Sequence, residues 1–181
     1  MPSWQKIARR IRVPLGFAFA ALYIWLAHPT WRSVVTGSGV AVVGLVIRAL
    51  ASGHVRKNEE LTTSGPYAYS RNPLYLGSLI IAVGFTLASR SWIIAAVAAA
   101  MLVIVYIPVI RSEEEFLRSR FSAFDDYRRN VPRLFPRLKL GQGSAGSFSA
   151  HLYWKHREYN AALGAGLMIT VLVAKSLWFR K

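Results

Sequence analysis

The sequence has no cysteine and only eight acidic residues among its 181. The absence of cysteine excludes disulfide bonds, thiol nucleophiles and cysteine-ligated zinc sites. The four histidines stand far apart without ligand-like spacing, so the sequence gives no indication of a metal site. Charged residues make up 17% of the chain, against about 25% in an average soluble domain. This shortage of charge argues against both a water-soluble domain and a disordered chain.

Apolar residues are abundant, at 54% of the chain, and they gather in five long stretches. These stretches span residues 11–27, 34–51, 74–88, 92–110 and 161–179. A helix needs about 20 predominantly apolar residues to cross a bilayer, within a range of about 17–25. Five such stretches in so short a chain would leave too little polar surface to cover them in water. We therefore predict an all-α fold, a polytopic membrane helix bundle of about five transmembrane helices, in a single domain over residues 1–181.

Two further features of these stretches, their arginines and their glycines, lead to structural predictions. The first three are short or end near an arginine, so we expect Arg12 and Arg48 to snorkel to the membrane surface. Small residues let membrane helices approach closely, so we expect the glycines within the stretches to be packing contacts. These glycines are Gly16, Gly37, Gly39, Gly44, Gly77, Gly164 and Gly166.

The net charge of +15 would suggest nucleic acid in a soluble protein, but its arrangement indicates a membrane instead. With the N-terminus in the cytoplasm, most of the 23 Lys and Arg residues fall on the cytoplasmic side, which is the positive-inside pattern. The sequence thus predicts an integral protein of a bacterial-type inner membrane, with a cytoplasmic N-terminus and no nucleic-acid partner. Lys175, Arg180 and Lys181 fall on the other side, which leaves the placement of the last helix open.

The first polar segment, residues 52–75, contains a turn followed by a predicted helix start. Ser64-Gly65-Pro66-Tyr67 is a turn pattern, and Asn72-Pro73 favours a helix N-terminus. Such an N-terminus attracts anions, and Arg71 directly before it adds a cation. The segment therefore suits a carboxylate or a phosphate. The alternative is an interfacial turn, with Arg71 as a headgroup anchor and Tyr67, Tyr69 and Tyr75 as membrane-belt residues.

The second polar segment follows the fourth apolar stretch. Leu117, Phe121, Phe124 and Tyr127 are spaced to line one face of a helix, which predicts a continuous amphipathic helix. Glu113, Glu114 and Glu115 form an acidic cluster at the membrane exit. Pairing with arginines on the same helix is one interpretation, but such pairs contribute only about 0.3–0.5 kcal/mol each. We therefore expect the cluster to face a cation.

Together the two segments carry the groups that bind a zwitterion. Arg71 with the helix N-terminus suits a carboxylate, and Glu113–Glu115 suit an ammonium group. Tyrosine rings can face a sulfonium through cation–π attraction. These residue types permit S-adenosylmethionine, an amino acid that carries a sulfonium, as the ligand.

The same residues resemble the isoprenylcysteine carboxyl methyltransferase family and, more distantly, the phospholipid N-methyltransferases. The shared pattern covers residues 61–136. It is matched by Gly65, Tyr67, Arg71, Pro73, Tyr75, Gly77, Glu113, Glu114, Leu117, Phe121, Tyr127, Val131, Pro132, Arg133 and Pro136. Two positions depart from it: Asn72 replaces a histidine, and Ser122 replaces a glycine. The loss of that histidine implies that catalysis here requires no acid–base imidazole at position 72.

The resemblance implies a membrane methyltransferase that takes S-adenosylmethionine from the cytoplasm and a lipidic or prenylated acceptor from the bilayer. The cofactor-binding residues then expected are Tyr67, Tyr69, Arg71, Asn72, Pro73, Tyr75, Gly77, Glu113 and Glu114. Arg71, Glu113 and Glu114 are the catalytic candidates, because a carboxylate acceptor needs alignment and an amine acceptor needs a base. Carboxyl O-methylation is the favoured reaction.

Other interpretations stay open at this point. They are phospholipid N-methylation, an NADPH-dependent membrane reductase with a distantly similar C-terminal region, and a non-catalytic protein that binds anionic lipid. The polar segment 151–164 before the last apolar stretch is expected either to cap the substrate entrance or to anchor the chain at the membrane surface. In the first case His156, Glu158 and Tyr159 point inward.

Overall fold

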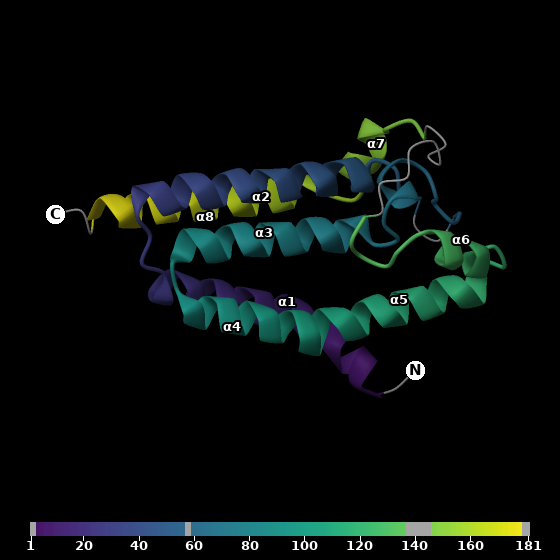
Figure 1. Ribbon diagram of the computed structural model, residues 1–181, viewed down its shortest axis with the longest axis horizontal. Helices are drawn as coiled ribbons and strands as arrows, with labels where there is room; N and C mark the ends of the chain where they lie inside the picture. Colours follow the sequence, from purple (N-terminus) through teal and green to yellow (C-terminus); the bar gives the residue numbers. More distant parts are fainter. Residues whose placement is uncertain (1–2, 57–58, 137–145, 179–181) are drawn as a thin grey trace.

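The computed structural model describes residues 3–56, 59–136 and 146–178. In these ranges the chain forms helices and no β-strand, which confirms the predicted all-α membrane bundle. Figure 1 shows long helices lying side by side, with short helices gathered in the connections at one end. The long helices are α1 (Ser3–Leu26), α2 (Trp31–Ser52), α3 (Pro73–Ser89), α4 (Trp92–Met101), α5 (Ile107–Arg120) and α8 (Tyr159–Trp178); the short ones are η1 (Gly65–Ala68), α6 (Phe124–Asn130) and α7 (Ala150–Lys155).

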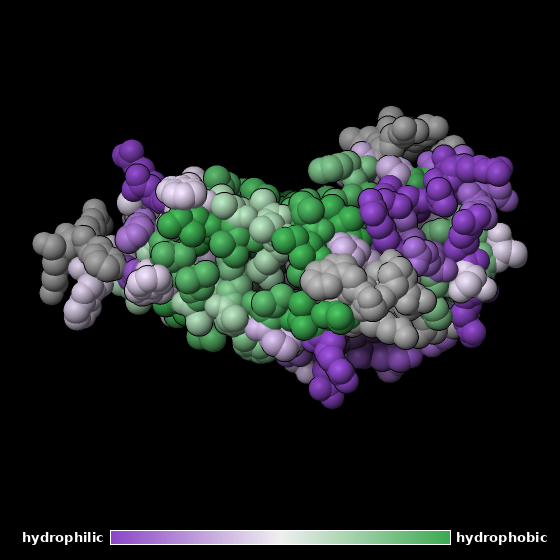
Figure 2. Space-filling model, turned by 90° about the horizontal axis from the view of Figure 1, so that it is seen from below, coloured by the Kyte–Doolittle hydropathy of each residue, from purple (hydrophilic) through white to green (hydrophobic). Residues whose placement is uncertain are grey.

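Five rods correspond to the five apolar stretches. A π-helical turn, η2 (Leu102–Tyr106), joins α4 and α5 into one rod of 29 residues, Trp92–Arg120. This rod, α2 and α8 are long and apolar enough to cross a membrane, whereas α3 and the apolar part of α1 (Pro14–Leu26) are shorter. Figure 2 shows an apolar surface across the middle of the molecule and hydrophilic residues at its ends. The chain is therefore a membrane protein.

The closest helix pair is α2 with α3. A Cβ on Gly84 would lie 2.6 Å from the Gly37 carbonyl, and a Cβ on Gly44 would lie 2.6 Å from the Gly77 carbonyl. The prediction of packing glycines is therefore confirmed for Gly37, Gly44 and Gly77. It was wrong for four others, where a Cβ would meet nothing within 4 Å because these positions face away from neighbouring helices; they are Gly16, Gly39, Gly164 and Gly166.

An apolar core closes the end of the bundle opposite the short helices. Its buried residues come from all five rods and are Tyr23, Ala27, Val34, Ala88, Ile94 and Leu172. The hydroxyl of Tyr23 donates to the Phe85 carbonyl at 2.7 Å, which satisfies the polar end of this buried side chain. The polar segments lie at the other end of the bundle, beside the short helices.

The prediction of a continuous amphipathic helix after the fourth stretch was wrong. Helix α5 ends at Arg120, Phe121 is extended (φ −125°, ψ 116°), and α6 begins at Phe124. The break turns Phe124 into the protein, where it is 2% exposed. Two predictions lie outside what the structure describes: the snorkelling of the Arg12 side chain, and the position of Arg180 and Lys181 on the far side of the membrane.

Candidate functional site

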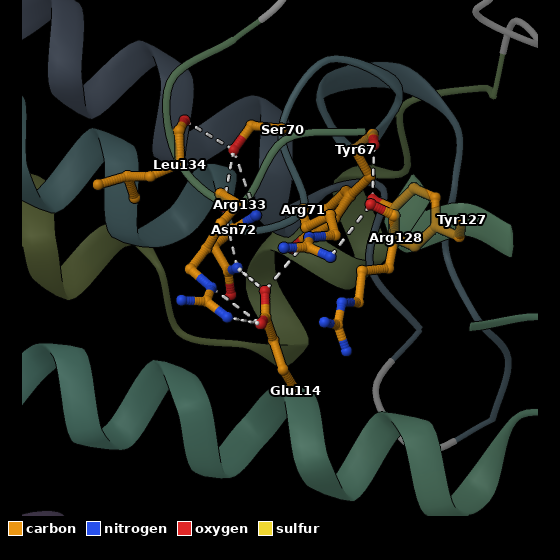
Figure 3. Close-up of polar contacts among 9 residues, drawn as sticks. All are labelled: Tyr67, Ser70, Arg71, Asn72, Glu114, Tyr127, Arg128, Arg133 and Leu134. Atoms are coloured by element: carbon orange, nitrogen blue, oxygen red, sulfur yellow. Dashed lines mark hydrogen bonds and ion pairs between the residues drawn. The ribbon is translucent and has the colours of Figure 1, made fainter. Parts of the chain in front are cut away.

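The two polar segments meet at one end of the bundle (Figure 3). A third segment, residues 131–136, lies along the start of α3 and holds it in place. The backbone N–H of Arg71 donates to the Pro132 carbonyl at 2.9 Å, and the hydroxyl of Ser70 donates to the Leu134 carbonyl at 2.9 Å. Residues that are far apart in the sequence therefore face one another across α3, α5 and this segment.

The carboxylate of Glu114 is the centre of the site. It reaches from α5 toward the start of α3 and is only 7% exposed. It accepts hydrogen bonds from Asn72 Nδ2 at 3.1 Å and Arg133 Nε at 2.9 Å, and its Oε1 lies 3.3 Å from Arg71 Nε. Burying a carboxylate is costly unless it is paired and hydrogen-bonded. Two guanidinium groups and one amide compensate that cost here.

Arg71 is a buried cation with a donor still unused. Its Nη1 donates to the Arg128 carbonyl at 3.4 Å, but its buried Nε makes no hydrogen bond among the described residues, despite the short distance to Glu114. Burial lowers the pKa of Arg71, and the nearby Glu114 carboxylate opposes that shift. The guanidinium remains charged at neutral pH, because arginine is in effect always protonated in proteins. Its Nε faces the Glu114 carboxylate as an ion pair and not as an aligned hydrogen bond.

Glu113 lies beside two tyrosines instead of an arginine. The Tyr75 hydroxyl donates to Glu113 Oε1 at 2.9 Å. The ring of Tyr75 packs edge-on against Tyr106, at 6.1 Å between centroids, and Tyr106 belongs to the π-helical turn. Turns of this kind occur often at functional sites. A half-buried carboxylate next to aromatic rings is suited to a cationic ligand.

The other predicted residues of the first segment have different environments. Tyr67 is buried and its carbonyl accepts from the Tyr127 hydroxyl at 2.6 Å. Burial raises the pKa of both phenols, so both stay neutral. Pro73 is fully buried in the first turn of α3, whereas Tyr69 is 38% exposed. Glu115 is exposed, so it does not join the other two glutamates.

The structure differs from the expected zwitterion site at one point. The sequence placed Arg71 and the glutamates at opposite ends of a ligand, but Arg71 and Glu114 form a direct ion pair at 3.3 Å. Of the three glutamates, Glu113 is the one that is partly accessible and separate from the arginines.

Two arginines near the site were missed or misinterpreted from the sequence. Arg133 matches the family pattern, in the letters VPR, but no role followed from that match. Arg48 was expected to snorkel, and this was wrong: its side chain turns inward and pairs with Glu158. Its stem lies over Gly77, where a Cβ would come within 2.5 Å of Arg48 Cγ. Gly77 therefore contacts α2 rather than the network around Glu114.

One cavity of the described residues lies away from this site. An open cavity of about 790 Å³ lies at the opposite end of the bundle. Its lining residues are His28, Pro29, Thr30, Trp31, Arg32, Arg90 and Ser176, none of which is a predicted site residue. Among the described residues, no three His, Asp or Glu side chains are grouped to hold a metal ion.

A family model described as phospholipid methyltransferase matches residues 16–123, which include Arg71, Asn72, Glu113 and Glu114. The chain belongs to the phospholipid methyltransferase family. This confirms the family predicted from the motifs, to which the isoprenylcysteine carboxyl methyltransferases are related. Arg133 and the rest of segment 131–136 lie outside the matched region.

Two relatives of this phospholipid methyltransferase family member carry other names. The cobalt-zinc-cadmium resistance protein CzcN of Cupriavidus metallidurans is 37% identical over 179 residues, which cover 93% of this chain and 74% of that protein. The nickel-cobalt-cadmium resistance protein NccN of Alcaligenes xylosoxydans xylosoxydans is 37% identical over 135 residues, which cover 71% of this chain and 62% of that protein. No solved structure is significantly similar to the chain.

Proposed function

We propose that this membrane protein is an S-adenosylmethionine-dependent methyltransferase acting on a lipidic or prenylated acceptor, with carboxyl O-methylation as the favoured reaction. The observation that carries the proposal is the meeting of Arg71, Asn72, Glu113 and Glu114 at the polar end of a membrane bundle. Membership of the phospholipid methyltransferase family supports the reaction class.

The residues present fit the amino-acid part of that cofactor. The start of α3 has no side-chain cap among the described residues, and the Arg71 guanidinium lies beside it. Together they suit a carboxylate. Glu113 and the Tyr75 ring suit the ammonium and sulfonium groups. Asn72 and Pro73 shape this corner, and Tyr67, Tyr69 and Glu114 complete the proposed cofactor-binding set.

The acceptor decides which residue assists the reaction. When bound, S-adenosylmethionine supplies an electrophilic methyl group on its sulfonium. A carboxylate acceptor is already a nucleophile, so the protein has only to orient and desolvate it. An amine acceptor must lose a proton, for which Glu113 is the better base because Glu114 is occupied by two arginines. The family description favours such an amine as the second candidate.

We also propose that the site faces the cytoplasm of a bacterial-type inner membrane. The polar connections that surround it carry most of the basic residues of the chain, and the positive-inside rule places such connections in the cytoplasm. The cofactor then reaches the site from water, and the acceptor reaches it from the bilayer.

A labelled methyl group tests the reaction. Purified protein is incubated with methyl-labelled S-adenosylmethionine and a bacterial lipid extract, and the lipid is then treated with alkali. We expect alkali-labile label, the mark of an ester; alkali-stable label would assign N-methylation, and label in no lipid would contradict both. Glu113→Gln is the test variant, and Glu115→Gln is the matched control because Glu115 is exposed.

Thermal stability separates the cofactors. We expect S-adenosylhomocysteine to raise the Tm of the purified protein, and NADPH to leave it unchanged. Stabilisation by NADPH alone would indicate a membrane reductase instead. If neither compound raises the Tm, the chain is a non-catalytic lipid-binding protein.

The two relatives are named as metal resistance proteins, which suggests a growth assay in the presence of a toxic metal. We propose that the chain contributes to metal tolerance through methylation of a membrane lipid. A deletion strain complemented with the wild-type gene should grow in cadmium better than one complemented with Glu113→Gln. Equal growth of the two complemented strains would remove the link between methylation and metal tolerance.

A further inference from the structure

A second ion pair lies inside the bundle, beside the proposed site. Arg48 of α2 pairs with Glu158 of the short connection between α7 and α8. Nε of Arg48 contacts Oε1 of Glu158 at 2.5 Å, and Nη2 donates to Oε2 at 3.0 Å. The side chains are only 23% and 10% exposed. The carboxylate therefore binds the guanidinium in the bidentate manner that distinguishes arginine from lysine.

The remaining nitrogen of this guanidinium is bound to α3. Nη1 of Arg48 donates to the Leu74 carbonyl at 3.3 Å and to the Ser78 hydroxyl. Leu74 directly precedes Tyr75, which binds Glu113, and the stem of Arg48 lies over Gly77. Arg48 is thus built against the same turns of α3 that form the proposed cofactor site.

The two sites also act on one side chain. Burial raises the pKa of the Tyr67 phenol, and the nearby Tyr127, Glu113, Arg48 and Glu158 act on it as well. Ser78 lies more than one helical turn beyond Pro73, the first residue of α3. The pair around Arg48 is therefore on the bundle side of the site, the side from which an acceptor dissolved in the bilayer arrives.

A purely structural role explains this pair poorly. Buried ion pairs often stabilise a fold no better than apolar contacts of the same size, because both charges lose their hydration. Charged side chains within membrane segments are expensive and usually serve binding or transport. Glu158 occupies the edge of the Arg48 guanidinium that can bind a carboxylate through two nitrogens. The pair therefore has the geometry of a carboxylate-binding site that is already filled.

We propose that Arg48 binds the carboxylate of a lipidic acceptor, and that Glu158 occupies this position when no acceptor is bound. The assignment of the ligand as a methyl acceptor rests on the proposed function. Glu158 directly follows Arg157, whose φ of 53° belongs to the turn that ends α7, where the backbone N–H groups of Arg157 and Glu158 donate to the Trp154 and Tyr153 carbonyls.

Binding of a simple lipid carboxylate tests the proposal without catalysis. Oleate and its uncharged analogue oleyl alcohol are titrated into the purified full-length protein in detergent, and bound ligand is counted by native mass spectrometry. We expect wild type to bind oleate in preference to the alcohol. Arg48→Gln should weaken oleate binding at least about tenfold, and Arg48→Lys should weaken it less.

The Glu158 variant is the decisive one. Glu158→Gln keeps the side-chain length but removes the competing charge, so oleate should bind about three- to tenfold more tightly than to wild type. Arg56→Gln and Glu60→Gln are the matched controls, because they break an exposed ion pair of the same chemical type. Both controls should bind oleate as wild type does.

The opposite results would overturn the proposal. If Glu158→Gln weakens oleate binding as much as Arg48→Gln does, the pair only joins α2 to α8. If Arg48→Gln binds oleate normally, the carboxylate site lies elsewhere. A Tm shift with S-adenosylhomocysteine, measured on the same samples, keeps the two proposals apart. Its absence in wild type refutes the proposed function, whereas its retention with no effect at Arg48 refutes only the acceptor site.

Discussion

The side-chain amide of Asn72 donates a hydrogen bond of 3.1 Å to Glu114, 42 positions further along the chain. The same nitrogen donates to the Arg133 carbonyl at 3.0 Å. Asn72 therefore ties the start of α3 both to α5 and to the segment after α6. It stands where the related methyltransferases have histidine, and here its side chain acts as a hydrogen-bond donor to a carboxylate. A neutral imidazole can also donate such a bond.

Replacement of Asn72 tests this donor role. Asn72→His should keep methyl transfer within about threefold, because the ring can still donate to Glu114. Asn72→Asp should lower transfer at least about tenfold, since it places a second carboxylate against the first. Transfer of labelled methyl, with circular dichroism to check folding, measures both. A variant with aspartate that remains fully active would show that Asn72 is not part of the site.

Removal of the charge of Glu114 should destabilise the protein. Glu114→Gln leaves the buried Arg71 without its carboxylate, and breaking a buried ion pair from one side costs about 3–5 kcal/mol. We expect a clear fall in Tm measured in detergent. Glu115→Gln, an exposed neighbour on the same helix, should leave Tm unchanged. Equal behaviour of the two variants would mean that the network around Glu114 adds no stability.

The contact between α2 and α3 predicts a second stability difference. Gly84→Ala places a methyl group 2.6 Å from backbone atoms of α2, an overlap that should cost about 1–3 kcal/mol. Gly164→Ala in α8 meets nothing within 4 Å and should be neutral or slightly stabilising. Thermal unfolding of the two variants in the same detergent makes the comparison. A neutral Gly84→Ala would contradict the close packing of the helices.

Burial of the Tyr127 phenol predicts how the stability of the folded protein changes at alkaline pH. Burial raises its pKa above the ordinary value of 10.0, so above pH 10 the unfolded state loses this proton before the folded state does. The associated stability is fully present below pH 10 and is lost as the pH rises further.

Tyr127→Phe should therefore reduce stability at neutral pH by about 1 kcal/mol, through loss of the bond to the Tyr67 carbonyl. Above pH 10 its Tm should fall less steeply than that of wild type. Tyr69→Phe, at an exposed position, is the control and should follow wild type throughout. Parallel Tm curves for Tyr127→Phe and wild type would contradict the buried phenol.

Local patterns predicted much of the site. The Asn72-Pro73 pair predicted the start of α3, because proline needs no donor in the first turn. The acidic cluster predicted polar contacts at the exit of the fourth rod, and its binding role stays a prediction. The sequence did not tell which glutamate is buried, since neighbouring residues on a helix point about 100° apart. The rotation of α5, set beyond the π-helical turn, buries Glu114 and leaves Glu113 beside Tyr75.

The sequence by itself determined the five apolar helical rods, three of them long enough to cross a membrane, because in hydrocarbon a backbone must satisfy its own hydrogen bonds within a helix. It also determined the family, through residues clustered in two short motifs. Only the tertiary structure decided the direction of Arg48, the break at Phe121 and the place of Arg133. Arg48 and Arg133 depend on distant partners, Glu158 and Glu114, and the balance between solvation and pairing is decided only when those partners are in place. The break at Phe121 accompanies the burial of Phe124 against the rest of the protein.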